Sequence, residues 1–108
     1  MQIQNVPFTS VSWDTVPKTN HPGETGYAVW KTVDTGNIRV RMVEYSSGYL
    51  ADHWCSRGHV IHILKGEMVS ELKDGSRSNL KEGMTYLMSD ANPHRTFTEN
   101  GVTLFIVD

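Results

Sequence analysis

The sequence has one cysteine, no excess of basic residues and no long apolar run, and each of these absences excludes a class of protein. The single cysteine, Cys55, cannot form an internal disulfide. Ten Lys and Arg residues stand against twelve Asp and Glu residues, whereas proteins that bind nucleic acid usually carry a basic excess. No stretch approaches the ~18 apolar residues of a membrane span, and residues 1–10 lack the basic start and apolar core of a leader peptide. We therefore expect a cytoplasmic protein that binds neither nucleic acid nor a membrane.

Short runs rich in Val, Ile, Leu, Tyr and Thr are abundant. They recur at roughly ten-residue spacing with Gly and Asp between them, which is typical of an all-β sandwich or barrel. The expected strands are 27–33, 38–45, 59–64, 67–72, 76–80, 84–88, 94–98 and 102–107. Almost no helix is expected.

A hairpin is predicted where Asp74 and Gly75 separate two of these runs. A type I′ turn needs two residues that tolerate positive φ, and Asp-Gly meets that need. Strands 67–72 and 76–80 should therefore pair in antiparallel fashion.

The chain is long enough for one hydrophobic core and too short for two, so we expect a single domain over residues 1–108. Residues 1–26 contain three of the four prolines and are expected to form an irregular lead-in, or one edge strand. The remaining residues, 27–108, must protect the edges of many short strands. Closure into a small jelly-roll barrel does this.

Three histidines and the only cysteine lie between His53 and His62. His53 and Cys55 are two residues apart, so on an extended segment both face the same way. His59 is again of even parity, although residues 56–58 are expected to bend the chain. His62 has the opposite parity and is a poor ligand candidate.

This segment resembles the first conserved motif of the cupin superfamily. In that motif a glycine precedes His-x-His, a Glu or Gln follows four residues later, and a glycine closes the next turn. Here those places are taken by Gly48, His53, Cys55, His59 and Gly66. Cysteine replaces the second histidine and histidine replaces the carboxylate or amide, and both substitutes can ligate a metal.

The segment GMTYLMSDANPHRTF is similar to the second cupin motif. Gly83 and His94 match it, while Ser89 and Ala91 stand where Pro and Gly are usual. More narrowly, the run from Asp52 to Cys55, with GETG upstream and the ending TLFIVD, resembles the small DHCW-motif cupin-fold proteins, a group without an assigned activity.

The resemblance implies one divalent transition metal, with zinc, iron and nickel as the candidates, held by His53, Cys55, His59 and His94. It also implies an enzyme of the oxygenase, isomerase or lyase type that acts on a small organic molecule in the barrel mouth. Four protein ligands would leave a position open on five- or six-coordinate iron or nickel but would fill the shell of tetrahedral zinc. The alternative is therefore a non-catalytic module with a structural metal site.

Other interpretations remain open at this point. Cys55 is also compatible with a buried core residue, a redox thiol, or a nucleophile paired with a histidine, although no third residue that would orient the base is evident. A partner-binding domain is a further possibility, and small cupins are commonly homodimers. Asp52 is a candidate for orienting a ligating histidine. Whether Arg41, Glu44 or Tyr86 lines the pocket is undecided.

Overall fold

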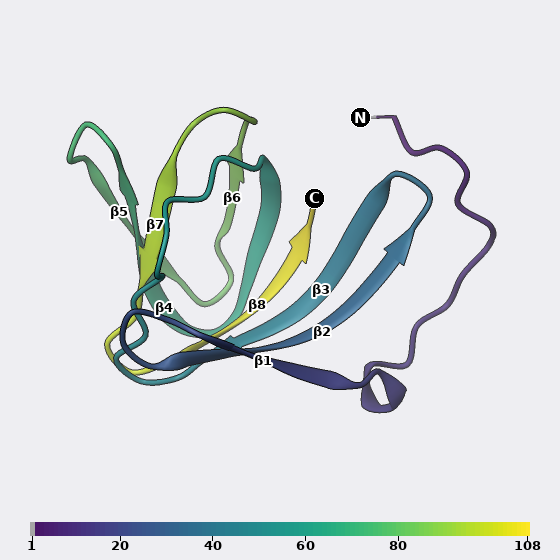
Figure 1. The fold of residues 1–108 in the computed structure, drawn as a ribbon, viewed down its shortest axis with the longest axis horizontal. Coiled ribbons are helices and arrows are strands. Elements are labelled where there is room, and N and C mark those ends of the chain that lie inside the picture. The colour runs from purple at the N-terminus through teal and green to yellow at the C-terminus, as the bar shows by residue number, and fades with distance from the viewer. Residues whose placement is uncertain (1) are drawn as a thin grey trace.

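The structure, a computed structural model, describes residues 2–108 and is built almost entirely of β-strands (Figure 1). One short 3₁₀ helix, η1, precedes the strands. In chain order the elements are η1 Trp13–Thr15, β1 Lys18–Pro22, β2 Tyr27–Thr35, β3 Ile38–Tyr45, β4 His59–Leu72, β5 Arg77–Lys81, β6 Thr85–Met88, β7 His94–Phe97 and β8 Val102–Val107. The expected all-β class is confirmed, and no helix in the described residues is long and apolar enough to cross a membrane.

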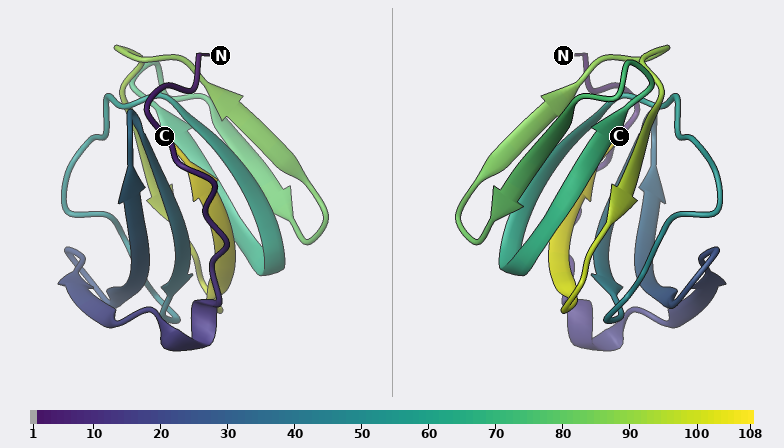
Figure 2. Two further views of the ribbon diagram at one scale, coloured as in Figure 1. Left: turned by 90° about the vertical axis from the view of Figure 1, so that its right-hand side faces the viewer. Right: turned by 90° about the vertical axis from the view of Figure 1, so that its left-hand side faces the viewer.

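The strands form two curved walls that meet along β4. Neighbours follow the order β1-β2-β3-β8-β4-β5, and β6 and β7 also pair with β4, all in antiparallel fashion. The first part of β4 pairs with β6 and β8, and its second part pairs with β5 and β7. Figures 1 and 2 show β1, β2, β3 and β8 curving along one side and β5 and β7 rising on the other. β6 belongs to the first of these walls, where it pairs with the first part of β4. This arrangement is the jelly roll that the strand pattern predicted.

One prediction about the strands is wrong in detail. The runs 59–64 and 67–72 are a single strand, β4, that bends where its register with β8 shifts between Ile63 and Lys65. Gly66 follows the shift with φ of 82°, and a side chain there would clash with the carbonyl oxygen of Gly101. The glycine that resembled a strand end therefore allows the strand to bend and to pass from one wall to the other.

The predicted β4–β5 hairpin is present, with Glu71 opposite Arg77. Its turn differs from the expected type. Of residues 73–76 only Gly75 has positive φ, and the backbone N–H of Leu72 donates to the carbonyl of Ser76 at 2.9 Å. The connection is thus a three-residue loop ending in a left-handed glycine, because Asp74 accepts hydrogen bonds from Ser76 instead of adopting positive φ itself.

The hydrophobic core fills the space between the walls. It consists of Val43, Ile61, Ile63, Met68, Leu80, Val102, Leu104 and Ile106. Several inward-facing rows of this core end in polar residues. On β4 the row of Ile63 and Ile61 ends at His59, and on β3 the row from Val43 leads to Arg41, both of them buried. The β8 row leads to Asp108, and these polar ends converge, since Asp108 contacts both Arg41 and His59.

Candidate metal centre

Three side chains from separate parts of the chain meet at one end of the core. The potential ligand atoms of Cys55, His59 and His94 all lie within 4.8 Å of one another. Nε2 of His59 is 2.9 Å from Nε2 of His94 and 3.6 Å from Sγ of Cys55. The structure thus brings together three of the four residues predicted as ligands.

Backbone pairing places Cys55 beside His94. The N–H of Cys55 donates to the carbonyl of His94 at 2.8 Å, and the N–H of His94 donates back to the carbonyl of Cys55 at 2.9 Å. The N–H of Ala51 donates to the carbonyl of Thr96 at 3.0 Å. The segment before β4 therefore runs alongside β7, as an extended segment does, and carries the cysteine to the start of that strand.

The Nδ1 atom of each of the two histidines, His59 and His94, lies beside a hydrogen-bond acceptor. Nδ1 of His59 lies 2.8 Å from Oδ2 of Asp108, and Nδ1 of His94 lies 2.9 Å from the carbonyl oxygen of Asn92. A carboxylate and a carbonyl only accept, so both Nδ1 atoms carry a proton and donate it. In the neutral rings the two Nε2 lone pairs then face each other at 2.9 Å. A proton or a metal cation between them relieves the repulsion.

Asp108 is a site residue that the sequence did not reveal. Its side chain is fully buried and accepts hydrogen bonds from Nε and Nη2 of Arg39, at 2.8 and 3.0 Å, and from Nη2 of Arg41 at 2.9 Å. Burial alone would raise the pKa of Asp108, but the hydrogen bonds with His59 and Arg39 outweigh it and hold that pKa well below its usual value. The sequence feature that could have indicated Asp108 is strand alternation, since Asp108 continues the alternating buried row of Val102, Leu104 and Ile106.

The electrostatics favour the thiolate form of Cys55. When a ring also carries a proton on Nε2, it can donate to the sulfur, and such hydrogen bonds, from His59 first and then from His94, lower the pKa of this thiol to about 5 against the opposing effect of burial. Burial would lower the pKa of His59, yet its hydrogen bonds with Asp108 and Cys55 raise it. The crowded thiolate and imidazole nitrogen therefore attract a positive charge to the point where the three side chains meet.

His53, the fourth predicted ligand, lies apart from this cluster. It lines the same cavity as Cys55, as their shared parity predicted, but its side chain is 73% exposed and its Nδ1 is 2.7 Å from Oδ1 of Asp52. Asp52 thus orients a histidine, although not one of the three that converge. Trp54 has the opposite parity and lies against Lys73 and Arg95.

The cluster opens into a cavity of about 290 Å³ between the walls. Its lining includes aromatic residues, four arginines and the three clustered side chains. The residues are Trp30, Arg39, Arg41, Tyr45, Tyr49, Ala51, His53, Cys55, Arg57, His59, Ile61, Tyr86, His94, Arg95, Thr96 and Ile106. Arg41 and Tyr86 therefore line the cavity, whereas Glu44 does not. His62 also lies elsewhere and contacts Thr85 at 2.7 Å.

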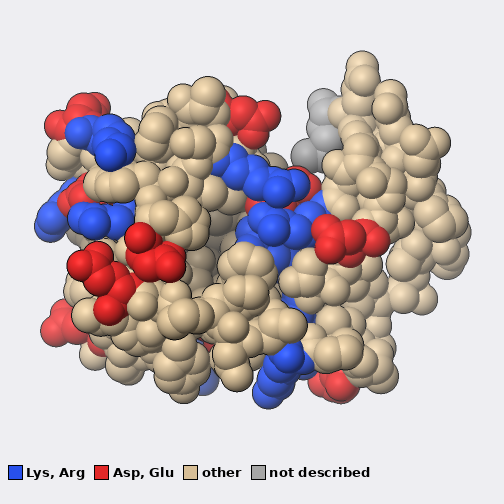
Figure 3. Space-filling view, in the orientation of Figure 1, with Lys and Arg blue, Asp and Glu red and all other residues tan. Residues whose placement is uncertain are grey.

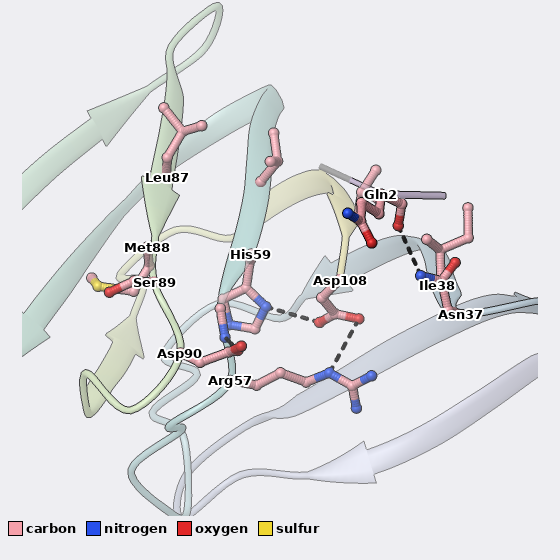
Figure 4. A pocket seen from close by; sticks show the side chains of 13 residues that line it. Gln2, Asn37, Ile38, Arg57, His59, Leu87, Met88, Ser89, Asp90 and Asp108 are labelled. Atoms are coloured by element: carbon pink, nitrogen blue, oxygen red, sulfur yellow. Dashed lines mark hydrogen bonds and ion pairs between the residues drawn. The ribbon is translucent and has the colours of Figure 1, made fainter. Parts of the chain in front are cut away.

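A broader hollow of about 770 Å³ lies on the other side of His59 and Asp108. Figure 4 shows these two side chains facing each other there, with Arg57 reaching toward the same carboxylate at 3.7 Å. The N–H of Gly58 donates to Oδ1 of Asp90 at 2.7 Å, which fixes the loop just before β4. His59 thus forms part of the boundary between the hollow and the inner cavity.

The donor set fits a transition metal. Nitrogen and sulfur ligands of one zinc ion lie about 2.0–2.3 Å from it, which places two such ligands roughly 3–4 Å apart. The separations of 2.9 and 3.6 Å around His59 are close to this range. One thiolate and two imidazoles suit zinc, iron or nickel better than magnesium or calcium.

Comparisons with known proteins identify the fold. No protein-family model and no curated protein matches the sequence. An RmlC-like cupin from Shewanella frigidimarina is 11% identical with a TM-score of 0.76, and the matched region covers 96% of this chain and 92% of the length of that cupin. Hydroxypropylphosphonic acid epoxidase from S. wedmorenis is 15% identical (TM-score 0.73, 94% of this chain, 59% of its own). Fe(II)-HppE with an alternative substrate is 12% identical (TM-score 0.75, 99% of this chain, 62% of its own). The chain has the cupin fold, as its two motif-like segments predicted.

Proposed function

We propose that this protein binds one divalent transition metal through Cys55, His59 and His94 and uses it to act on a small organic substrate in the adjoining cavity. One observation carries the proposal. Two imidazoles, each donating from Nδ1 to an acceptor, turn their Nε2 atoms toward each other beside a thiol with a lowered pKa. That combination is what a bound cation requires of its ligands.

Three protein ligands favour catalysis over a purely structural role. Structural zinc sites are usually closed by four protein ligands, whereas a three-residue set leaves a coordination position open. A metal bound there would supply a Lewis acid, able to polarise a substrate oxygen or lower the pKa of a bound water. The cavity beside the cluster offers room for that substrate.

Three further residues around the site have roles that follow from their contacts. Asp108 holds the His59 ring and is therefore a positioning residue. His53, supported by Asp52 at the cavity wall, is in a position to accept or donate a proton. Burial raises the pKa of Tyr86 to about 12, so its hydroxyl remains protonated and can donate a hydrogen bond to a ligand.

Metal content of purified and reconstituted protein tests the proposal. We expect about one metal ion per chain in the wild type and a large loss in Cys55→Ala and His94→Ala. His62→Ala is the matched control, because His62 lies on the same strand as His59 but outside the cluster, and it should retain the metal. If neither cluster substitution lowers metal content, the ligand assignment is wrong.

A second candidate function is supported by the spatial arrangement of Cys55, His59 and Asp108, in which the histidine lies between the thiol and the carboxylate. Sγ is 3.6 Å from Nε2 of His59, whose Nδ1 is 2.8 Å from the carboxylate, which is the arrangement of an activated thiol nucleophile. His94 has no place in that chemistry, yet its Nε2 is nearer to His59 than the sulfur is. We therefore rank this function second.

Alkylation of Cys55 with iodoacetamide separates the two functions. A metal ligand is protected by bound metal and reacts quickly only after chelation. A catalytic nucleophile reacts quickly in both conditions, and its reactivity survives His94→Ala.

A homodimer and a cytoplasmic location remain predictions. Within residues 2–108 β1 pairs only with β2 and so has one free edge, which a second copy could cover. Light scattering at micromolar concentration measures the oligomeric state.

A further inference from the structure

The cavity beside the metal cluster is lined by positive charge. Arg39, Arg41, Arg57 and Arg95 all contribute to its wall, and no Asp or Glu of the described residues does so. Figure 3 shows Lys and Arg side chains gathered between the two walls of the molecule. A cavity of this composition attracts anions.

The charges around the cavity do not balance. Arg39, Arg41 and Arg57 share a single carboxylate, that of Asp108, at 2.8, 2.9 and 3.7 Å. Arg95 is paired with Glu71 at 3.0 Å. Three guanidinium groups exceed that one carboxylate by two positive charges, and the thiolate form of Cys55 in the same wall offsets one of them. Arg41 is only 5% exposed to the water that would otherwise solvate it.

Two buried donors in the cavity wall also lack acceptors. Nε of Arg41 and Nε1 of Trp30 have no hydrogen-bond partner among the described residues. The Arg41 guanidinium lies 4.4 Å from the centre of the Trp30 ring, so the two residues are adjacent. Both atoms can only donate, and leaving a buried donor unpaired is costly. A ligand with acceptor atoms in the cavity would satisfy them.

We propose that the cavity binds a small organic carboxylate, with Arg41 and Trp30 as the residues that recognise the acid group. This inference rests on the proposed function and adds the substrate class to it. A planar carboxylate has two acceptor oxygens that match a guanidinium fork, and it supplies the negative charge that the arginines lack. At about 290 Å³ the cavity lies at the lower end of small-molecule sites, so an acid of a few carbon atoms fits.

Calorimetric titration tests the inference with defined probes. Propionate and succinate are compared with their uncharged amides and with methylphosphonate, at constant ionic strength. We expect at least one carboxylate to bind and its amide to bind at least about tenfold more weakly, since a hydrogen bond to a charged group contributes more than one to a neutral group.

Two variants and one control assign the binding to these residues. Trp30→Phe removes one donor and keeps an aromatic ring, and Arg41→Lys keeps the charge and removes the fork. We expect each to weaken carboxylate binding about tenfold. Arg77→Gln is the control, because Arg77 is exposed, pairs with Glu71 and does not line this cavity, and it should change nothing. Trp30→Phe keeps the test decisive if Arg41→Lys fails to fold.

The outcomes for the cavity and for the metal are separable when metal content is measured in the same samples. Fully loaded protein that binds no carboxylate, binds amide equally well or prefers methylphosphonate overturns the inference and leaves the metal site intact. Carboxylate binding by protein that takes up no metal supports the recognition residues and overturns the proposed function. An equal effect of Arg77→Gln also contradicts the inference, because binding would then reflect net charge alone.

Discussion

Asp108 lies 2.8 Å from Nδ1 of His59, and its carboxylate is shared with Arg39 and Arg41. One buried carboxylate thus joins the candidate metal ligands to the arginines of the cavity wall. Because it fixes the imidazole on one side and two guanidinium groups on the other, the metal cluster and the anion-attracting wall depend on the same residue.

Asp108→Asn should weaken metal binding about 10–100-fold, because the neutral amide no longer holds His59 as a charged acceptor does. It should also lower the free energy of unfolding by about 3–5 kcal/mol, since Arg41 would stay buried without its counter-ion. Metal titration and urea unfolding measure the two effects. Glu99→Gln removes a negative charge from an exposed position outside these contacts and should alter neither. Unchanged metal affinity in Asp108→Asn would remove Asp108 from the positioning role.

His53→Ala should retain metal and lose turnover of whichever substrate is found. The structure holds this ring outside the cluster, against Asp52 at the wall of the cavity. Elemental analysis checks the first expectation and an activity assay the second. If the variant instead loses its metal, His53 is the fourth ligand that the cupin-like motif predicted, and the ring must turn inward when metal binds.

Removal of the metal should destabilise the fold. A ligand present at 100 times its dissociation constant stabilises a protein by about 2.7 kcal/mol, which corresponds to a fall in Tm of roughly 10 °C or more for a domain of this size. Thermal unfolding with and without a chelator measures the change, and His94→Ala serves as the matched sample because it should show little response. A chelator effect of equal size in that variant would mean that the chelator acts elsewhere.

Gly66→Ala should lower the free energy of unfolding by at least about 2 kcal/mol, because Gly66 combines a positive φ with a position where a side chain meets the backbone of Gly101. Gly75→Ala is the matched control, since Gly75 also has positive φ but no described residue lies within 4 Å of an added Cβ there. We expect about 1 kcal/mol there. Chemical denaturation measures both values, and equal losses would show that the bend of β4 tolerates a side chain.

Much of the fold was predictable because strand alternation is a local property. The spacing of apolar runs indicated the strands, and Asp74 and Gly75 marked the β4–β5 connection. The bend in β4 was not predictable, because Gly66 has the same local signature whether a strand ends or bends. Pairing with β8 through the bend is a long-range contact and decides between the two.

The candidate site was predictable only in part. Parity correctly gave His53 and Cys55 a common face, but it does not set the direction of a ring, and the neighbouring Asp52 offers His53 a partner outside the cluster. Arg41 was undecided because both faces of its strand carry apolar residues. Asp108 lay at the end of an alternating row, yet its role depends on contacts with residues about fifty or more positions away, such as His59.

X-ray absorption at the metal edge tests the proposed centre most directly. With one metal ion per chain, we predict a first shell that contains one sulfur scatterer and at least two imidazole nitrogens. The sulfur contribution should vanish in Cys55→Ala. A shell of nitrogen and oxygen alone in the wild type, or a spectrum that Cys55→Ala leaves unchanged, would contradict a centre built from Cys55, His59 and His94.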